Sequence, residues 1–141
     1  LPQFCDLTDI MISRIDKAIT YLSTSYISAV FQVLFMPVRP DMLNGVGWLQ
    51  GGLYSALCDE AMALALFTVL EEEEDIATIS ESTSFLQGIK KGCISAQAKV
   101  VKKGRRVAFV EGGVTSRDDG TPLSLTQASF AIIPRRSSRG R

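Results

Sequence analysis

The chain has 141 residues, 46% hydrophobic and 21% charged, a composition that fits one folded domain and excludes a disordered protein. Fifteen Lys and Arg balance fifteen Asp and Glu, so the basic excess that is typical of nucleic-acid-binding proteins is missing. The chain contains no histidine, which excludes Ser-His-Asp and Cys-His catalytic groups and imidazole-based zinc sites within it.

The N-terminal part of the chain predicts a helix and then a strand. Apolar residues recur with helical spacing over residues 9–22, behind Thr8 as a helix cap, and alternate with a period of two over residues 26–38. Residues 18–38 carry no charge and are long enough to cross a membrane. The change of periodicity within them favours a helix, a turn and a strand, and therefore argues against a membrane span.

A second helix is predicted over residues 51–70, after a glycine-rich loop. Apart from Ser55, Asp59, Glu60 and Thr68, all residues from 53 to 70 are apolar. A helix that is apolar on nearly every face is buried on nearly every face. The acidic run that follows, residues 71–75, indicates an exposed loop.

Four further segments alternate as strands do: residues 76–85, 92–102, 106–117 and 123–133. In the first of them, the alternation places Thr78 on one face with Ser80, Ser82 and Ser84. The turns at Lys103-Gly104 and Asp119-Gly120 are short, so we expect antiparallel neighbours and a meander.

This order of elements predicts an α+β domain over residues 1–134, in which a curved antiparallel sheet wraps around the apolar helix. Residues 135–141 are rich in Arg, Ser and Gly and are expected to form a disordered basic tail. One sheet cannot cover all sides of a short helix, which favours a homo-oligomer.

The three cysteines indicate the compartment. Cys5, Cys58 and Cys93 are odd in number and lie far apart without a C-x-x-C pair, so a disulfide framework or metal site is not expected. A reducing cytoplasm is therefore predicted. The chain begins with Leu and shows no signal peptide, so we expect its true N-terminus to lie upstream.

The segment from Asn44 to Ala61, NGVGWLQGGLYSALCDEA, resembles the signature of a known protein family. Its Asn, its Gly-Gly pair and the Asp that follows on the same helix resemble the signature of hotdog-fold acyl-CoA thioesterases, most closely the phenylacetate-pathway (PaaI-like) branch. Thr78, Phe85-Leu86, Gly92, Gly104-Arg105 and Asp119-Gly120 follow in family order, so the resemblance covers residues 26–133. It implies a hotdog fold, with five to six antiparallel strands around a long buried helix.

The site residues can be argued from chemistry as well as from the resemblance. Gly51 and Gly52 lie where the helix begins, and the free N–H groups and positive dipole there can stabilise an oxyanion. Asp59 lies two turns into an apolar helix, where a carboxylate must be paired or becomes reactive. The resemblance implies that Asp59 is the general base on water, or the nucleophile, toward a thioester held by the glycines of a neighbouring subunit.

Other residues have supporting or structural assignments. The resemblance implies that Asn44 holds the thioester carbonyl or the water and that Thr78 assists the acid or the water, although Asn is also common in turns and Thr in strands. Gln50 and Thr78 are expected to bind the substrate. Gln50 stands where many relatives have a His that helps position the thioester or the Asn, and its amide can donate and accept hydrogen bonds but cannot carry a proton. Cys58 is interpreted as a core residue, and Glu60 is expected in a polar contact or in solvent.

The predicted function is hydrolysis of an acyl-CoA to free acid and CoA by a cytoplasmic homodimer or homotetramer. We expect no cofactor other than the coenzyme A of the substrate, no metal, no nucleic acid and no membrane partner. The alternatives are a protein that binds acyl-CoA or a fatty-acyl ligand without cleaving it, and a purely structural dimer. A hotdog hydratase or dehydratase is disfavoured because the resemblance ties that chemistry to a His.

Overall fold

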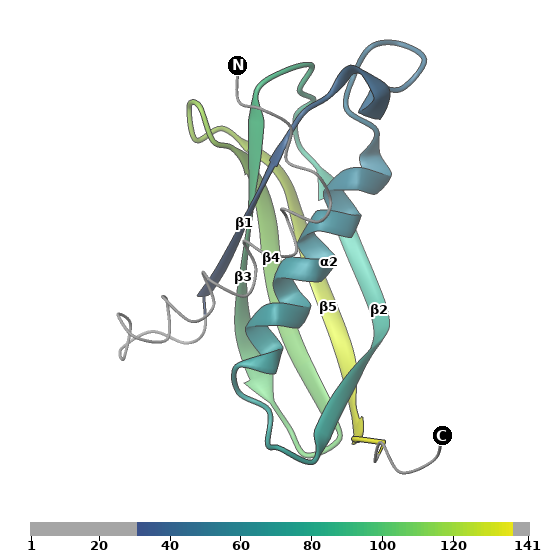
Figure 1. Ribbon diagram of the computed structural model, residues 1–141, viewed down its shortest axis with the longest axis vertical. Coiled ribbons are helices and arrows are strands. Elements are labelled where there is room, and N and C mark those ends of the chain that lie inside the picture. Colours follow the sequence, from purple (N-terminus) through teal and green to yellow (C-terminus); the bar gives the residue numbers. More distant parts are fainter. Residues whose placement is uncertain (1–30, 137–141) are drawn as a thin grey trace.

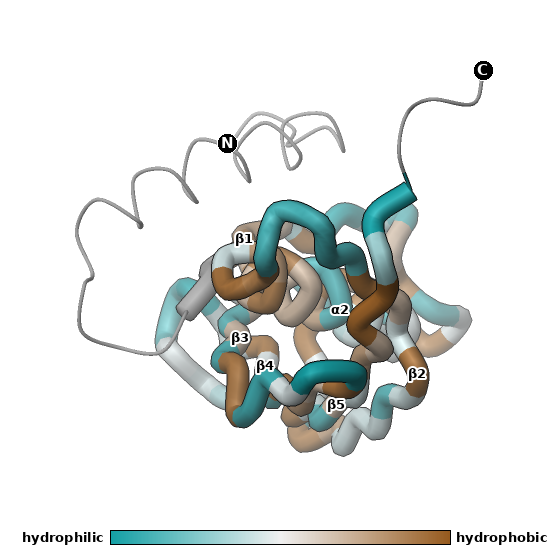
Figure 2. The backbone as a smooth tube through the Cα atoms, turned by 90° about the horizontal axis from the view of Figure 1, so that it is seen from below, coloured by the Kyte–Doolittle hydropathy of each residue, from teal (hydrophilic) through white to brown (hydrophobic). Residues whose placement is uncertain are grey.

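Five antiparallel strands lie in the order β1-β3-β4-β5-β2 and curve around one long helix, α2 (Figure 1). The computed structural model describes residues 31–136. In the end-on view of Figure 2, the labelled strands form an arc around α2. The elements are β1 (Phe31–Pro37), a 3-10 turn (Pro40–Met42), α2 (Gly51–Phe67), β2 (Glu74–Phe85), β3 (Cys93–Lys103), β4 (Val107–Ser116) and β5 (Pro122–Pro134).

The predicted elements are found within the described residues, and the α+β hotdog arrangement is confirmed. The exposed loop expected at residues 71–75 is shorter than predicted, because its last two residues, Glu74 and Asp75, already belong to β2. The Glu74 carboxylate is held by Lys103 Nζ at 2.9 Å, which fixes the start of this strand. The helix predicted at residues 9–22, the start of the first strand and residues 137–141 lie outside the described residues.

The expected meander is only partly right. β3, β4 and β5 follow one another as antiparallel neighbours, but β2 pairs with β5 and not with β3. The reason is that β1 and β4 occupy both edges of β3, so β2 takes the free edge of β5. At the end of β2, the N–H of Leu86 donates to the carbonyl oxygen of Leu123 at 2.8 Å, and residues 86–92 then lead back to β3.

The helix lies close to the sheet because a glycine faces it. A Cβ atom on Gly112 of β4 would lie 2.7 Å from Cys58 Sγ and 2.8 Å from the Gln97 carbonyl oxygen. Ala61 and Ala65 are fully buried on the same side of α2, where small side chains allow close packing. The opposite side of the helix is only partly covered, and Gly52, Ala56 and Phe67 are exposed. None of the helices in residues 31–136 is long and apolar enough to cross a membrane.

A β-bulge changes the predicted faces of β2. Thr78 pairs with Phe130 and Glu81 pairs with Ala128, with a register shift between Thr78 and Ser80. Phe130 and Ala128 are buried against the helix, so Thr78 and Glu81 both face α2 although they are three residues apart. The expectation that Thr78 shares a face with Ser80, Ser82 and Ser84 is therefore wrong, because simple alternation takes no account of the extra residue at Ile79.

We predict that Gly112→Ala destabilises the fold by about 1–3 kcal/mol, because the added methyl group overpacks the contact between α2 and β4. The matched control is Gly45→Ala, whose new Cβ meets nothing within 4 Å. Urea unfolding of both variants measures the difference in free energy. Equal stability of the two variants would show that α2 can move away from the sheet without cost.

Candidate active site

The loop before α2 is an ordered turn centred on Asn44. The Asn44 Oδ1 atom accepts hydrogen bonds from the backbone N–H groups of Val46 at 3.0 Å and Trp48 at 3.1 Å. The Asn44 N–H donates to the Trp48 carbonyl oxygen at 2.7 Å. Asn44 therefore acts as a turn residue, and only its side-chain NH₂ group remains for a ligand. Its predicted role toward a thioester stays a prediction.

Hydrogen bonds and packing hold this loop against the neighbouring chain segments. The N–H of Gln50 donates to the carbonyl oxygen of Met42 at 3.1 Å, and the N–H of Leu49 donates to the carbonyl oxygen of Ile89 at 2.8 Å. The Trp48 ring packs so closely on Gly88 that a Cβ there would lie 2.8 Å from it. The turn therefore presents the start of α2 in a defined position.

The helix begins with two glycines whose backbone N–H groups are available. Among the described residues, no acceptor is found for the N–H of Gly51 or Gly52. Gln50 is the N-cap residue, and its exposed side chain makes no capping hydrogen bond. A Cβ on Gly52 would meet nothing within 4 Å, whereas one on Gly51 would lie 3.2 Å from the Phe85 ring. The positive end of the helix dipole thus meets an open space that an anionic group can enter.

The polar residues of α2 lie along β2 as a series of contacts. Ser55 Oγ donates to Thr83 Oγ1 at 3.5 Å, and Thr83 Oγ1 shares a 2.9 Å hydrogen bond with Thr126 Oγ1. One helical turn further on, Thr78 Oγ1 donates to Asp59 Oδ1 at 3.3 Å. The structure therefore brings Asp59 and Thr78 together, as the sequence predicted, and leaves Asn44 at the far end of the helix.

A second carboxyl group, that of Glu81, joins this contact and was missed in the sequence. The register of β2 turns its side chain toward α2, where its carboxyl group interacts with that of Asp59. Partial burial of its carboxyl group, together with the hydrogen bond and the negative charge of Asp59, raises the pKa of Glu81 to about 7. Only knowledge of the bulge would have placed Glu81 beside Asp59.

Cys58 is a core residue, as predicted. Its side chain is fully buried, and this burial is the main reason that its pKa is raised to about 11. The negative charges of Glu81 and Asp59 raise it further. A thiol in this state is a poor nucleophile. The neighbouring Glu60 is half-buried on a different side of the helix turn.

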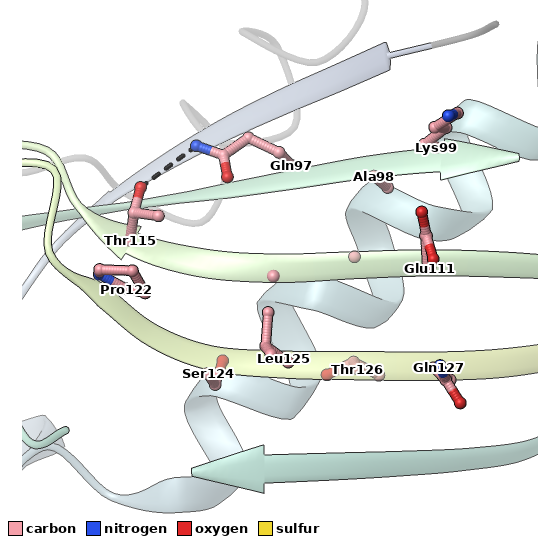
Figure 3. A pocket seen from close by; sticks show the side chains of 12 residues that line it. Gln97, Ala98, Lys99, Glu111, Thr115, Pro122, Ser124, Leu125, Thr126 and Gln127 are labelled. Carbon is pink, nitrogen blue, oxygen red and sulfur yellow. Dashed lines mark hydrogen bonds between the residues drawn. The ribbon is translucent and has the colours of Figure 1, made fainter. Parts of the chain in front are cut away.

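A pocket of about 520 Å³ lies on the other face of the sheet, away from α2 (Figure 3). Gln97, Thr115, Leu125 and Gln127 line it, and Gln97 Nε2 donates to Thr115 Oγ1 at 3.2 Å. None of the predicted site residues lines this pocket. The candidate site is instead the edge of α2 that runs beside β2.

With this geometry in place, comparison with known proteins identifies the family. Residues 47–123 match the family described as "Thioesterase superfamily". The chain belongs to the thioesterase superfamily. This match covers both the helix start and the Asp59 contact, so the resemblance seen in the sequence is confirmed.

Individual relatives agree with this assignment. A Caenorhabditis elegans protein that carries the name of an esterase is 29% identical over 100 residues, which make up 70% of this chain and 59% of the relative. A Mycobacterium tuberculosis protein with the name of an esterase, Rv1847, is 28% identical over 74 residues, 50% of this chain and 53% of the relative. The chain thus spans little more than half the length of the curated relatives that it matches.

Solved structures share the fold. A Ralstonia eutropha protein described as a phenylacetic acid degradation-related thioesterase has a TM-score of 0.68 and 26% identity, over 73% of this chain and 76% of that one. The Haemophilus influenzae thioesterase HI1161 has a TM-score of 0.74 over 98% of this chain and 97% of that one. At 18% identity, the second likeness concerns the fold alone.

We predict that Cys58 stays unmodified when the folded protein is exposed to iodoacetamide at pH 8. With a pKa of about 11, roughly one Cys58 side chain in a thousand is a thiolate at that pH. Peptide mass spectrometry measures the extent of alkylation, and the half-buried Cys93 is the internal comparison. The reference rate is that of Cys58 in protein unfolded by about 8 M urea. If Cys58 reacts as rapidly in the folded protein, its assignment to the core is contradicted.

Proposed function

We propose that this protein is an acyl-CoA thioesterase that hydrolyses its substrate to a free acid and coenzyme A. The observation that carries the proposal is the combination on one helix of two N–H groups, at Gly51 and Gly52, that have no acceptor within residues 31–136 and a hydrogen-bonded carboxylate at Asp59. Membership of the thioesterase superfamily supports a hydrolase. The acyl-CoA substrate and the residue roles below belong to the proposal.

In the proposed reaction, the thioester carbonyl oxygen lies against the N–H groups of Gly51 and Gly52. Asp59 takes a proton from a water molecule whose oxygen attacks the carbonyl carbon, and the negative charge then forms on the carbonyl oxygen. One donor to such an oxyanion contributes about 2.7–4 kcal/mol to the stability of the transition state. The C–S bond then breaks, and the sulfur leaves as the thiol of coenzyme A after accepting the proton. No cofactor is required.

The two halves of this machinery lie too far apart within one chain. Gly51 and Asp59 are eight positions apart on α2, which corresponds to about 12 Å along the helix axis. A carbonyl group bound at the glycines would not reach the Asp59 carboxylate of the same helix. We therefore propose a homodimer as the minimal unit, in which Asp59 acts on a thioester held by the glycines of the partner.

The edge of β2 supports the same assembly. β2 lies at the end of the sheet and is paired only with β5 among the described strands, so its outer edge has free backbone groups. Ile79 and Phe85 of this strand are more than half exposed, at 58% and 57%. Pairing with a second copy would cover them, and two such dimers would form a tetramer. We also propose a cytoplasmic location, with which the free Cys58 and Cys93 are consistent.

We predict that Asp59→Asn lowers turnover about 10²- to 10⁴-fold, the usual contribution of a general base, without unfolding the protein. The measurement is thiol release from short, long and aromatic acyl-CoAs. The matched control is Glu60→Gln on the next residue, which should retain near wild-type turnover. Undiminished turnover in Asp59→Asn would remove Asp59 from the proposed role.

The same assay separates hydrolysis from simple binding. If the wild type releases no thiol but an acyl-CoA raises its Tm, the protein is a binding protein and the proposed hydrolysis is refuted. Gln50, which cannot carry a proton, would then be the first position to substitute with His.

We predict that two inactive variants restore activity when they form mixed dimers. Asp59→Asn lacks the acid, and Gly51→Pro lacks one N–H donor while Pro remains compatible with the first position of a helix. In a mixed dimer, one of the two sites has both wild-type residues, so random mixing should recover about a quarter of the wild-type activity. Co-expression with two affinity tags provides the mixed species. Absence of recovery in a purified mixed dimer would show that the site is built within one chain.

A further inference from the structure

The bulge in β2 has a specific consequence for the site. In a regular strand, Thr78 and Glu81 would point to opposite faces because successive side chains alternate. The register shift between Thr78 and Ser80 turns both toward α2, opposite the buried Phe130 and Ala128 of β5. Bulges often occur next to active sites, where they redirect a side chain. Here the redirected side chain is a carboxylic acid placed beside another.

Glu81 is exposed at the edge strand, and the described protein groups that act on its carboxyl group lie on α2 and β5. On α2, the titratable groups that act on it or feel its charge are the Asp59 carboxyl group and the thiol of Cys58. On β5, the residue opposite is the apolar Ala128. Two carboxyl groups can form a hydrogen bond only when one of them holds a proton. A hydrogen bond between Glu81 and Asp59 therefore requires that the two groups share a proton.

We propose that Glu81 is a positioning residue of the Asp59 site, which holds the proton of the pair and donates it in a hydrogen bond to the Asp59 carboxylate. This inference rests on the proposed function for the role of Asp59. With Thr78 Oγ1 donating at 3.3 Å, Asp59 then has two donors on β2 that fix its orientation. Loss of the Glu81 proton removes one donor and places two negative charges side by side.

The electrostatics locate this change near neutral pH. Glu81 has a pKa of about 7, chiefly because its carboxyl group is partly desolvated. Below that pH the pair carries one negative charge and the Asp59 carboxylate is held. Above it, repulsion drives the two groups apart, and turnover falls.

The first test measures thiol release over a pH series in the wild type, Glu81→Gln and Glu81→Ala. The matched control is Glu72→Gln, a substitution at an exposed glutamate. In the wild type and in Glu72→Gln, kcat should fall as the pH rises through about 7. Glu81→Gln keeps a donor that cannot ionise, so its kcat should stay high through this range. Glu81→Ala should lose about tenfold to a hundredfold in kcat with little change in KM. An unchanged pH step in Glu81→Gln overturns the proposal.

The second test does not depend on activity. A carboxyl group whose folded-state pKa is raised from 4.5 to about 7 binds more protons in the folded than in the unfolded state between these values. The wild type should therefore lose Tm relative to Glu81→Gln as the pH rises across this window, and the difference should be constant above it. In the Asp59→Asn background, the pKa of Glu81 should be raised less because the charge of Asp59 is gone. The pH range over which the Tm difference develops should then end at a lower pH.

The two tests separate the two ideas. The Tm difference between the wild type and Glu81→Gln is followed from about pH 4 to about pH 8, the range that the raised pKa predicts. If this difference does not vary with pH, Glu81 holds no extra proton, and the inference is overturned even if the protein is a thioesterase. A wild type without thiol release on any acyl-CoA, combined with the expected Tm series, overturns the proposed function while the shared proton stands. Thiol release together with both pH effects supports the proposal in full.

Discussion

The site depends on one constraint: a carboxylate on a largely apolar helix must be given hydrogen-bond donors. Asp59 accepts a hydrogen bond from Thr78 of β2, and Glu81 of the same strand is the second donor that we propose. This is possible only because β2 runs along α2 at the edge of the sheet, and because a bulge directs both of its side chains toward the helix. The close contact of α2 with Gly112 on β4 sets the height of the helix above the sheet. The packing of α2 on β4 thereby helps to set the position of Asp59 relative to Thr78, its hydrogen-bond donor on β2.

Much of the fold could be predicted because its signals are local. The alternation in residues 92–102 correctly predicted a strand, and the apolar run after Gly52 correctly indicated the helix. The position of β2 could not be predicted in this way. Whether a strand pairs with β3 or with β5 depends on which edges the other strands leave free, which is not written in any single segment.

The site shows the same division between local and non-local information. The spacing of the glycines and Asp59 was readable, since both lie on one helix, and Thr78 was found through the family resemblance. Glu81 was missed because a bulge shifts the alternation by one residue, and no rule of composition locates a bulge inside a run of Ser and Thr. For Asn44 the sequence left both a ligand contact and a turn role open, and its Oδ1 is engaged in the turn.

The absence of histidine from the sequence gives the carboxyl pair its wider meaning. Histidine is normally the side chain that gains or loses a proton near neutral pH, and an isolated carboxyl group does so more than two pH units lower. A carboxyl group that is partly desolvated and lies beside a second one overcomes this limit, because desolvation and then the neighbouring charge raise its pKa. Glu81, with a pKa of about 7, titrates in the range that an imidazole would otherwise cover. In the pair that we propose, two neighbouring acids would supply proton chemistry near neutral pH, and the bulge in β2 is the structural feature that turns Glu81 toward the helix that carries Asp59.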